Sequence, residues 1–137
     1  MKQQINTLKI KTKGQGLYEF TSNIVKYVNE EKIENGLLTI YIKHTSCSLL
    51  IQENADSDVK KDLLNFFSKI VPENENYIHK SEGPDDMPAH IKSSLTQTNL
   101  SIPIENFEIA LGTWQGVYLF EHRKSSHTRI IKMHLIG

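Results

Sequence analysis

The sequence predicts an α+β protein with a mainly antiparallel sheet system. Strand-like segments outnumber helix-like ones, and the two kinds do not alternate in the regular βαβ order that builds a parallel sheet. The 137 residues suit a single domain over residues 1–137, and a hydrophobic fraction of 38% supplies a modest core. No internal repeat or linker-like tract divides the chain.

The first elements are two strands and a helix. Apolar and polar residues alternate over 5–11, which predicts a strand, and a glycine turn leads to a short strand with Tyr18 and Phe20. A helix follows, with Thr21 or Ser22 as its cap. Its expected apolar face comprises Ile24, Val25, Val28 and Ile33.

Two more strands and the clearest helix come next. Residues 37–44 alternate as a strand, and residues 48–52 can pair beside it. The helix is expected to begin at Asp56 or Ser57 as its cap and to end at Pro72. Helical spacing places on one face Val59, Leu63, Phe66, Phe67 and Ile70.

A long irregular stretch over 72–88 separates this helix from a third, short one. A loop of that length in a small domain is usually functional or disordered. The short helix is expected to begin near Pro88 and to bury Ile91 and Leu95. The segments that read as the remaining strands are 100–104, 107–110, 117–122 and 128–136.

Composition excludes several classes of protein. Sixteen Lys and Arg balance sixteen Asp and Glu, and this zero net charge argues against a broad nucleic-acid surface. No apolar run approaches the roughly 20 residues of a membrane helix, and no apolar signal region is seen at the N-terminus. A single cysteine excludes an intramolecular disulfide and multi-cysteine metal sites. We therefore expect a cytoplasmic protein that binds neither nucleic acid nor membranes.

Histidine placement indicates a metal site. Asp86 and His90 are four residues apart at the start of a helix, so both can reach one ion from one face. A helix N-terminus also favours neutral imidazole, the form that binds metal. His44 at a strand end and His79 in the long loop are further candidates. The Asp-x-x-x-His spacing is common by chance, and a strand-end or solvated role stays open for the other two.

Other residues carry weaker signals. Glu53 and Asn54 follow a strand without an evident structural role and could line a site at the strand end. Cys47 is expected to be a small buried hydrophobic residue, since no base is placed to activate it. Trp114 lies between two glycines, which suggests a packed turn with a buried indole or the wall of a ligand site.

The basic segment 122–129 could meet an anion. Arg123 and Arg129 are the best placed, because a guanidinium pairs phosphate with two hydrogen bonds. His122 and His127 flank this segment and are expected to be exposed. His134 is expected to be structural. The segment also leaves nucleic-acid binding open as a minor alternative.

Four ordered motifs resemble the YjbQ family, also called UPF0047 and the secondary thiamine-phosphate synthase enzyme family. They are HTSCSL at 44–49, ENAD at 53–56, GPDDMPAHIK at 83–92 and LGTWQG at 111–116. The resemblance spans about residues 17–137. It implies a β-sandwich with about three helices that assembles as a trimer. It also implies weak thiamine-phosphate synthase activity, which joins a pyrimidine pyrophosphate to a thiazole phosphate and releases pyrophosphate.

The family pattern has histidines at the positions of His44, His79 and His90 and an aspartate at Asp86. The resemblance therefore implies a divalent metal, zinc first, on the three histidines. The remaining site residues that we carry over are Glu53, Asp86 and Arg129 as catalytic and Asn54 and Lys92 as substrate-binding. A small phosphorylated metabolite is the expected partner. A trimer that binds metal or metabolite without turnover is the alternative.

Two positions depart from the family pattern. Cys47 stands where many members have a smaller residue such as alanine, in keeping with a structural thiol. Many members read Glu-Phe-Asp-Gly-Pro-Arg near the end, whereas this chain has a longer and more basic turn over 121–129. The resemblance therefore does not identify which residues of that turn bind an anion.

Overall fold

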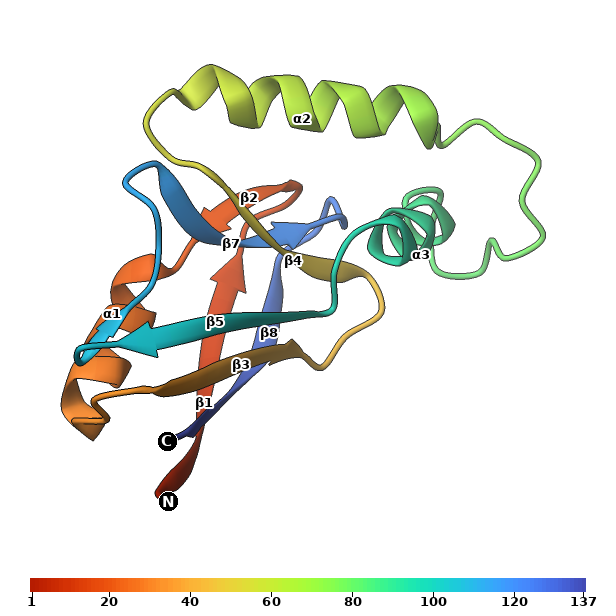
Figure 1. The fold of residues 1–137 in the computed structure, drawn as a ribbon. Coiled ribbons are helices and arrows are strands. Elements are labelled where there is room, and N and C mark those ends of the chain that lie inside the picture. The colour runs from red at the N-terminus through yellow and green to blue at the C-terminus, as the bar shows by residue number, and fades with distance from the viewer.

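Two antiparallel sheets form a sandwich that three helices flank (Figure 1). The computed structural model describes all 137 residues. A five-stranded sheet has the order β1-β8-β3-β5-β6, and a three-stranded sheet has the order β2-β7-β4. The strands are β1 (Gln3–Thr12), β2 (Gly16–Glu19), β3 (Gly36–Ile42), β4 (Cys47–Glu53), β5 (Asn99–Glu105), β6 (Glu108–Ile109), β7 (Gln115–Glu121) and β8 (His127–Ile136). The helices are α1 (Thr21–Glu31), α2 (Ser57–Ile70) and α3 (Asp86–Leu95). The predicted α+β class is confirmed.

The core contains residues from both sheets and from α1. Buried and exposed residues alternate along β5 and β8, as expected for strands with one face on a core. In β7 the last six residues are all buried, so this strand is covered on both faces. Cys47 is fully buried in the core, and burial raises the pKa of its thiol to about 12. The prediction of a small buried hydrophobic residue is confirmed.

The strand predictions hold with three adjustments. Residues 48–52 form a strand as predicted, but this strand, β4, pairs with β7 in the three-stranded sheet and not with β3, so the predicted pairing is wrong. Strand β3 ends at Ile42, so His44 lies just beyond it. The strand expected over 107–110 shrinks to the two residues of β6, because Asn106 and Phe107 form a turn with φ of 51° and 67°. None of the three helices combines the length and the hydropathy that crossing a bilayer requires.

Helix α1 corrects two predictions. No side chain caps it, because Thr21 Oγ1 instead donates to Glu19 and accepts from the Val117 backbone N–H. Val25 is 37% exposed and does not belong to the buried face, which Tyr27 joins instead. At 100° per residue, Val25 falls about 60° outside the stripe of buried residues, beyond Val28.

Helix α2 crosses above the three-stranded sheet (Figure 1). The Asp56 carboxylate accepts a hydrogen bond from the Asp58 N–H at 2.9 Å and so caps the helix, as predicted. No residue of α2 is fully buried, and Phe66 and Ile70 are 54% and 49% exposed. The predicted apolar face therefore exists but is only partly covered by this chain.

Helix α3 differs most from prediction. It begins at Asp86, and Leu95 is 58% exposed rather than buried. Ile91 is only partly buried. Its buried residues are Asp86, Pro88, Ala89, Lys92 and Ser93, most of which are not hydrophobic. The helix is held by polar contacts, such as Ser93 Oγ donating to the Cys47 carbonyl at 2.8 Å.

A buried ion pair joins the ends of four segments. Arg129 on β8 donates from Nε and Nη2 to the Glu121 carboxylate, and both side chains are almost fully buried. Thr12 Oγ1 also donates to Glu121, and Arg129 Nη2 donates to Ser46 Oγ at 3.0 Å. This pair ties β1, β7, β8 and the β3–β4 connection together.

We expect Glu121→Gln to destabilise the fold strongly. The change leaves the Arg129 guanidinium buried without its counter-charge, which costs about 3 kcal/mol or more. Urea unfolding of the wild type and the variant measures the difference. Glu34→Gln, at an exposed position, is the matched control and should shift the free energy of unfolding by less than about 0.5 kcal/mol. Equal shifts in the two variants would contradict the structural role of the pair.

Candidate metal centre

Two imidazoles and two carboxylates converge at the start of α3. The candidate ligand atoms of His79, Glu82, Asp86 and His90 all lie within 4.8 Å of one another. Asp86 Oδ2 is 2.7 Å from His79 Nε2 and 3.1 Å from His90 Nε2. Glu82 Oε2 is 3.3 Å from His79 Nε2. We call these four residues the α3 cluster.

The local fold explains this convergence. Asp86 and His90 project from one face of α3, as their spacing predicts. The long loop after α2 leads back to the start of α3 (Figure 1). His79 and Glu82 lie on this loop and reach the same point as Asp86 and His90. Gly83 has a φ of 104°, which lets the loop turn sharply into the helix.

Arg123 orients the carboxylates of the cluster. Its Nη1 donates to Asp86 Oδ1 at 2.7 Å, and its Nε donates to Asp85 Oδ2 at 3.0 Å. Its Nη2 donates to the carbonyl of Glu82 at 2.9 Å. The guanidinium thus holds one oxygen of Asp86 and leaves the other facing the two histidines.

The backbone fixes the tautomer of His90. Its Nδ1 lies 2.9 Å from the Thr45 carbonyl oxygen, which can only accept, so Nδ1 carries the proton. In the neutral ring the Nε2 lone pair then faces Asp86 Oδ2, also an acceptor. Two lone pairs at 3.1 Å repel each other, so this contact needs either a proton on Nε2, which makes an ion pair with Asp86, or a metal ion bound by both atoms. This arrangement has the form of a metal ligand with an oriented outer hydrogen bond.

The cluster keeps its carboxylate charged. Burial alone would raise the pKa of Asp86, but the hydrogen bond with His79 and the charges of His90 and Arg123 outweigh it and lower that pKa. Burial is likewise outweighed at Asp85, whose pKa is lowered by the Lys124 N–H and by Arg123. Both groups are therefore carboxylates at neutral pH.

His79 lies between two hollows. One, of about 730 Å³, is formed mainly by residues 76–81 with Met87. The other, of about 370 Å³, is formed by Glu73, Tyr77 and residues around Pro84. The volumes of both hollows suit a small metabolite, and Lys80 lines both of them.

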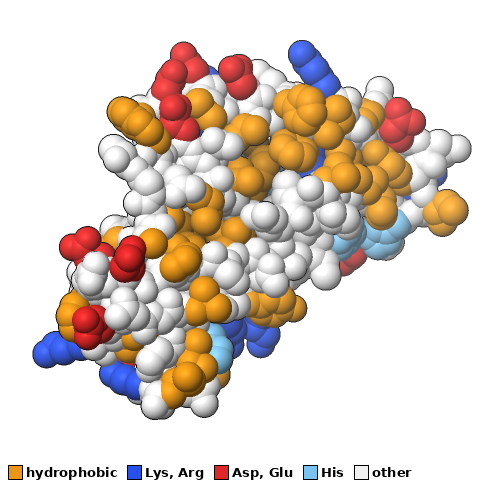
Figure 2. Space-filling model, viewed as in Figure 1, with side chains coloured by type: hydrophobic (Ala, Val, Ile, Leu, Met, Phe, Trp, Pro, Cys, Tyr) orange, Lys and Arg blue, Asp and Glu red, His pale blue; other side chains and the backbone are white.

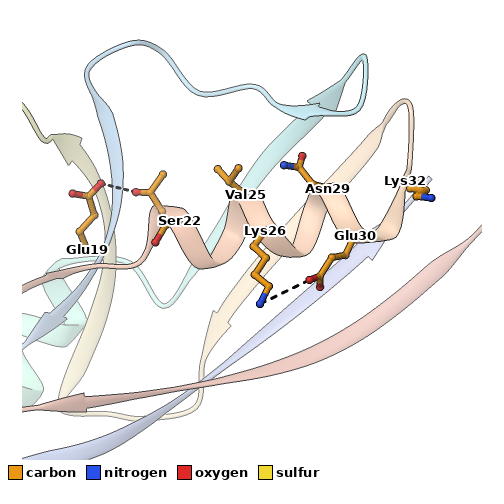
Figure 3. Close-up of a pocket in the computed structure, with 8 residues that line it drawn as sticks. Glu19, Ser22, Val25, Lys26, Asn29, Glu30 and Lys32 are labelled. Atoms are coloured by element: carbon orange, nitrogen blue, oxygen red, sulfur yellow. Dashed lines mark hydrogen bonds and ion pairs between the residues drawn. The ribbon is translucent and has the colours of Figure 1, made fainter.

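A larger hollow of about 1020 Å³ lies along α1 but offers no comparable chemistry (Figure 3). Its side chains extend along one helix rather than converging on a point, and the Lys26–Glu30 pair is an ordinary exposed one (Figure 3). No buried polar residue lines it. The α3 cluster is therefore the better candidate site.

The structure does not bring His44 to the α3 cluster. His44 Nε2 accepts a hydrogen bond from the Ile130 N–H at 2.8 Å, so that lone pair is already used. Burial and the charge of Arg129 lower the pKa of His44, which favours its neutral form. The cluster contains Glu82 in addition to His79, Asp86 and His90, and it does not contain His44.

Glu53 and Asn54 lie at the far end of β4. Ser93 of α3 contacts Cys47 at one end of this strand, and Glu53 is six residues further, about 20 Å away in an extended chain. Asn54 N donates to the Trp114 carbonyl at 3.0 Å. Trp114 is 62% exposed, so the expectation of a buried indole is wrong. Within one chain these residues do not meet the α3 cluster.

The two arginines expected to meet an anion both meet carboxylates. Arg129 is 3% exposed and bonded to Glu121, and Arg123 is bonded to Asp85 and Asp86. Within this chain, therefore, neither guanidinium is placed as a free anion receptor. Sequence reasoning missed Glu82, although an acidic residue four positions before Asp86 was a usable signal.

Lys92 and His122 form a second polar group behind α3. Lys92 is 6% exposed, and a shift of two residues from His90 turns its side chain by about 200°, away from the cluster. His122 is 1% exposed, so the expectation that it lies on the surface is wrong. Burial, together with the charges of Lys92 and Arg129, lowers the pKa of His122 to about 3.

Comparison with known proteins gives one consistent result. The family model described as UPF0047 protein YjbQ-like matches residues 6–137. The UPF0047 protein sll1880 of Synechocystis sp. is 49% identical over 99% of this chain and 93% of its own length. The UPF0047 protein YjbQ of Escherichia coli O157:H7 is 42% identical, with 96% of both chains covered.

A solved structure agrees with the fold. The crystal structure of an uncharacterised conserved protein of the YjbQ/UPF0047 family from Clostridium acetobutylicum has a TM-score of 0.89 at 33% identity. The match covers 96% of this chain and 99% of that chain.

Neutral His122 should make stability depend on pH. Its folded-state pKa is about 3 against an ordinary 6.5, so in that window the unfolded chain binds a proton that the folded chain excludes. Stability therefore rises with pH, and the His122 contribution is lost as pH falls below 6.5. Through this effect the free energy of unfolding changes with pH by up to about 1.4 kcal/mol per pH unit.

Urea unfolding between pH 5 and pH 7 measures this slope. The difference between wild type and His122→Gln should show this slope. The control His134→Gln, at a ring hydrogen-bonded to Gln3 on β1, should keep the wild-type dependence. Identical slopes for all three proteins would contradict a buried neutral His122.

Proposed function

The chain belongs to the UPF0047 family of YjbQ-like proteins, and from this premise we propose that it binds a divalent metal and acts on a small phosphorylated metabolite. His79, Asp86 and His90 are the proposed ligands, with Glu82 as the fourth. The observation that carries the proposal is the pair of lone pairs on His90 Nε2 and Asp86 Oδ2, fixed toward each other by Thr45 and Arg123.

The donor set fits zinc best. Two imidazoles and two carboxylates suit a tetrahedral zinc ion, although manganese, iron and nickel accept the same donors. Ligands about 2.1 Å from a tetrahedral centre lie about 3.4 Å apart. The separations of 3.1 Å from His90 to Asp86 and 3.3 Å from His79 to Glu82 are close to that value. The 2.7 Å between His79 and Asp86 has to widen by about 0.7 Å for both to bind one ion.

The surrounding chain suggests how a phosphate substrate would be handled. A bound divalent metal supplies Lewis-acid polarisation of a phosphoryl oxygen. Lys80 lines both hollows beside His79, so it can receive the charge of a departing phosphate or pyrophosphate. This role replaces the one expected of Arg129, which is committed to Glu121.

The specific reaction that we propose to test is thiamine-phosphate synthesis, with release of pyrophosphate. The competing proposal is a protein that binds metal or a phosphorylated metabolite without turnover. The placement of Glu53 favours this competitor for the isolated chain, since this expected catalytic residue lies at the opposite end of β4 from α3. A site shared between subunits would bring the two ends together.

Self-association as a homotrimer belongs to the same proposal. Hydrophobic side chains gather over the C-terminal part of α2 and the loop after it, beside histidines (Figure 2). In this region Phe66, Ile70 and Ile78 are 54%, 49% and 99% exposed. Exposed apolar surface of this kind marks an interface. A cytoplasmic location also belongs to the proposal and agrees with a single unpaired cysteine.

We expect natively purified protein to contain close to one transition-metal ion per chain. His79→Ala should lose that metal because it removes an imidazole from the centre of the cluster. Elemental mass spectrometry of both proteins measures this. The matched control is His134→Ala, whose ring contacts Gln3 on β1 and should not affect the metal.

Absence of metal from wild type, even after reloading with zinc or manganese, would refute the metal proposal. Pyrophosphate release from the two thiamine precursors then separates the two functions. Turnover by the loaded wild type that His79→Ala abolishes supports the enzyme. Metal binding without turnover supports the binding protein.

The double variant Phe66→Ser, Ile70→Ser should dissociate the assembly. It removes apolar area that α2 leaves uncovered, so the particle should fall from three times the 15.7 kDa chain mass towards one. Sedimentation velocity measures this mass. Val25→Ser, in an exposed apolar residue of α1, should leave the assembly unchanged. A wild type that sediments as a monomer would rule out the trimer.

A further inference from the structure

A partly open pocket of about 160 Å³ lies behind α3, on the side away from the α3 cluster. Its walls come from α2, the end of β7, the β1–β2 turn and α3. The residues that line it are Gln15, Leu64, Asn65, Phe67, Ser68, Lys92, Phe120, Glu121 and His122. We call it the Lys92 pocket.

Lys92 brings an unpaired positive charge to this pocket. It is 6% exposed, and its ammonium group forms no hydrogen bond or ion pair with the chain. Burial lowers the pKa of Lys92, and the carboxylates of Glu73 and Asp85 oppose this lowering without contacting the ammonium. Glu121 also lines the pocket, but its carboxylate oxygens are held by Arg129 and Thr12. The negative charge of Glu121, the one acidic residue that lines the pocket, is therefore already paired within the chain.

His122 brings an unpartnered nitrogen to the same pocket. The ring is 1% exposed, and its Nδ1 is the one buried side-chain nitrogen or oxygen in the chain without a hydrogen-bond partner. Since the ring is neutral, one nitrogen carries a proton and the other a lone pair. Which nitrogen carries it depends on the neighbour of Nε2.

A hydrogen-bond chain explains how the proton can reside on Nδ1. Thr96 Oγ1 donates to Ser48 Oγ at 2.6 Å, and Ser48 Oγ lies 2.8 Å from His122 Nε2. Thr96 Oγ1 also lies 2.8 Å from the Lys92 carbonyl oxygen and has a single proton to donate. When it donates that proton to Ser48, the Ser48 proton is free to go to Nε2. His122 Nδ1–H and the Lys92 ammonium are then two donors without an acceptor in one pocket.

We propose that the Lys92 pocket binds a small oxyanion, either a phosphate group or a short carboxylate. The Lys92 ammonium supplies charge, and His122 Nδ1–H supplies a directed hydrogen bond. Amides of Gln15 and Asn65 and the Ser68 hydroxyl offer further donors around the pocket. The ligand needs only acceptor atoms, which is what an oxyanion presents.

The size of the pocket sets the class of ligand. A water molecule takes about 30 Å³ of liquid volume, so about 160 Å³ holds several waters, a phosphate or a short carboxylate. Leu64, Phe67 and Phe120 form an apolar part of the wall that accepts a few carbon atoms. A nucleotide does not fit. The inference does not depend on the proposed metal function, because no residue of the α3 cluster lines this pocket.

Isothermal titration with inorganic phosphate and, separately, with acetate tests the proposal. Wild type should bind at least one of them with a ratio of one per chain, and the two arms identify the anion. Lys92→Met keeps the length of the side chain and removes the charge, so it should weaken binding about tenfold or more. Lys61→Met, in an exposed lysine of α2, should change the affinity less than about twofold.

Two further measurements keep the proposal falsifiable. His79→Ala should retain anion binding, which separates the Lys92 pocket from the α3 cluster. Nitrogen-15 NMR of histidine-labelled wild type should show the His122 proton on Nδ1 when the anion is bound. No saturable binding of either anion, or binding that His79→Ala abolishes and Lys92→Met retains, would overturn the proposal.

Discussion

The fork of hydrogen bonds from Arg123 is the interaction on which the candidate centre depends. It joins the connection after β7 to Asp85, Asp86 and the Glu82 carbonyl, and so holds the end of the long loop and the start of α3 together. The backbone N–H of Lys124 adds a second bond to Asp85 at 2.9 Å. Because a guanidinium presents its donors in a fixed plane, the same contacts that anchor the loop also set which oxygen of Asp86 faces the histidines.

Much of the fold could be predicted because its strands bury alternate residues, and alternation is visible in the sequence. The Asp86–His90 contact could be predicted for a similar reason, since helical spacing is local. The predictions that failed concern contacts between residues that are far apart in the sequence. Leu95 reads as the core side of α3, yet the sheet offers that helix polar partners such as the Cys47 carbonyl. The burial of His122 likewise depends on α2 crossing above it, which no local pattern contains.

Helix α3 separates two sites of opposite chemical character. One face presents acceptor atoms that need a cation, at Asp86 and His90. The other presents Lys92, a donor that needs an anion. The helix is linked to β4 on this second side through Thr96, which contacts Ser48 and the Lys92 carbonyl. A ligand on either side therefore acts on the same rigid element, whose position relative to β4 both sites share.

The cost of burial argues that these polar groups are functional. A domain of this size is stabilised by about 5–15 kcal/mol, and an uncompensated buried charge costs several kcal/mol of that. The chain compensates its other buried charges within itself: Glu121 pairs with Arg129, and Asp86 pairs with Arg123. The Lys92 ammonium forms no ion pair and the neutral His122 ring leaves Nδ1 without a hydrogen-bond partner, and both residues lie in the wall of one pocket. Because the chain pairs its other buried charges, these two groups without partners are the physical reason for proposing a ligand in the Lys92 pocket.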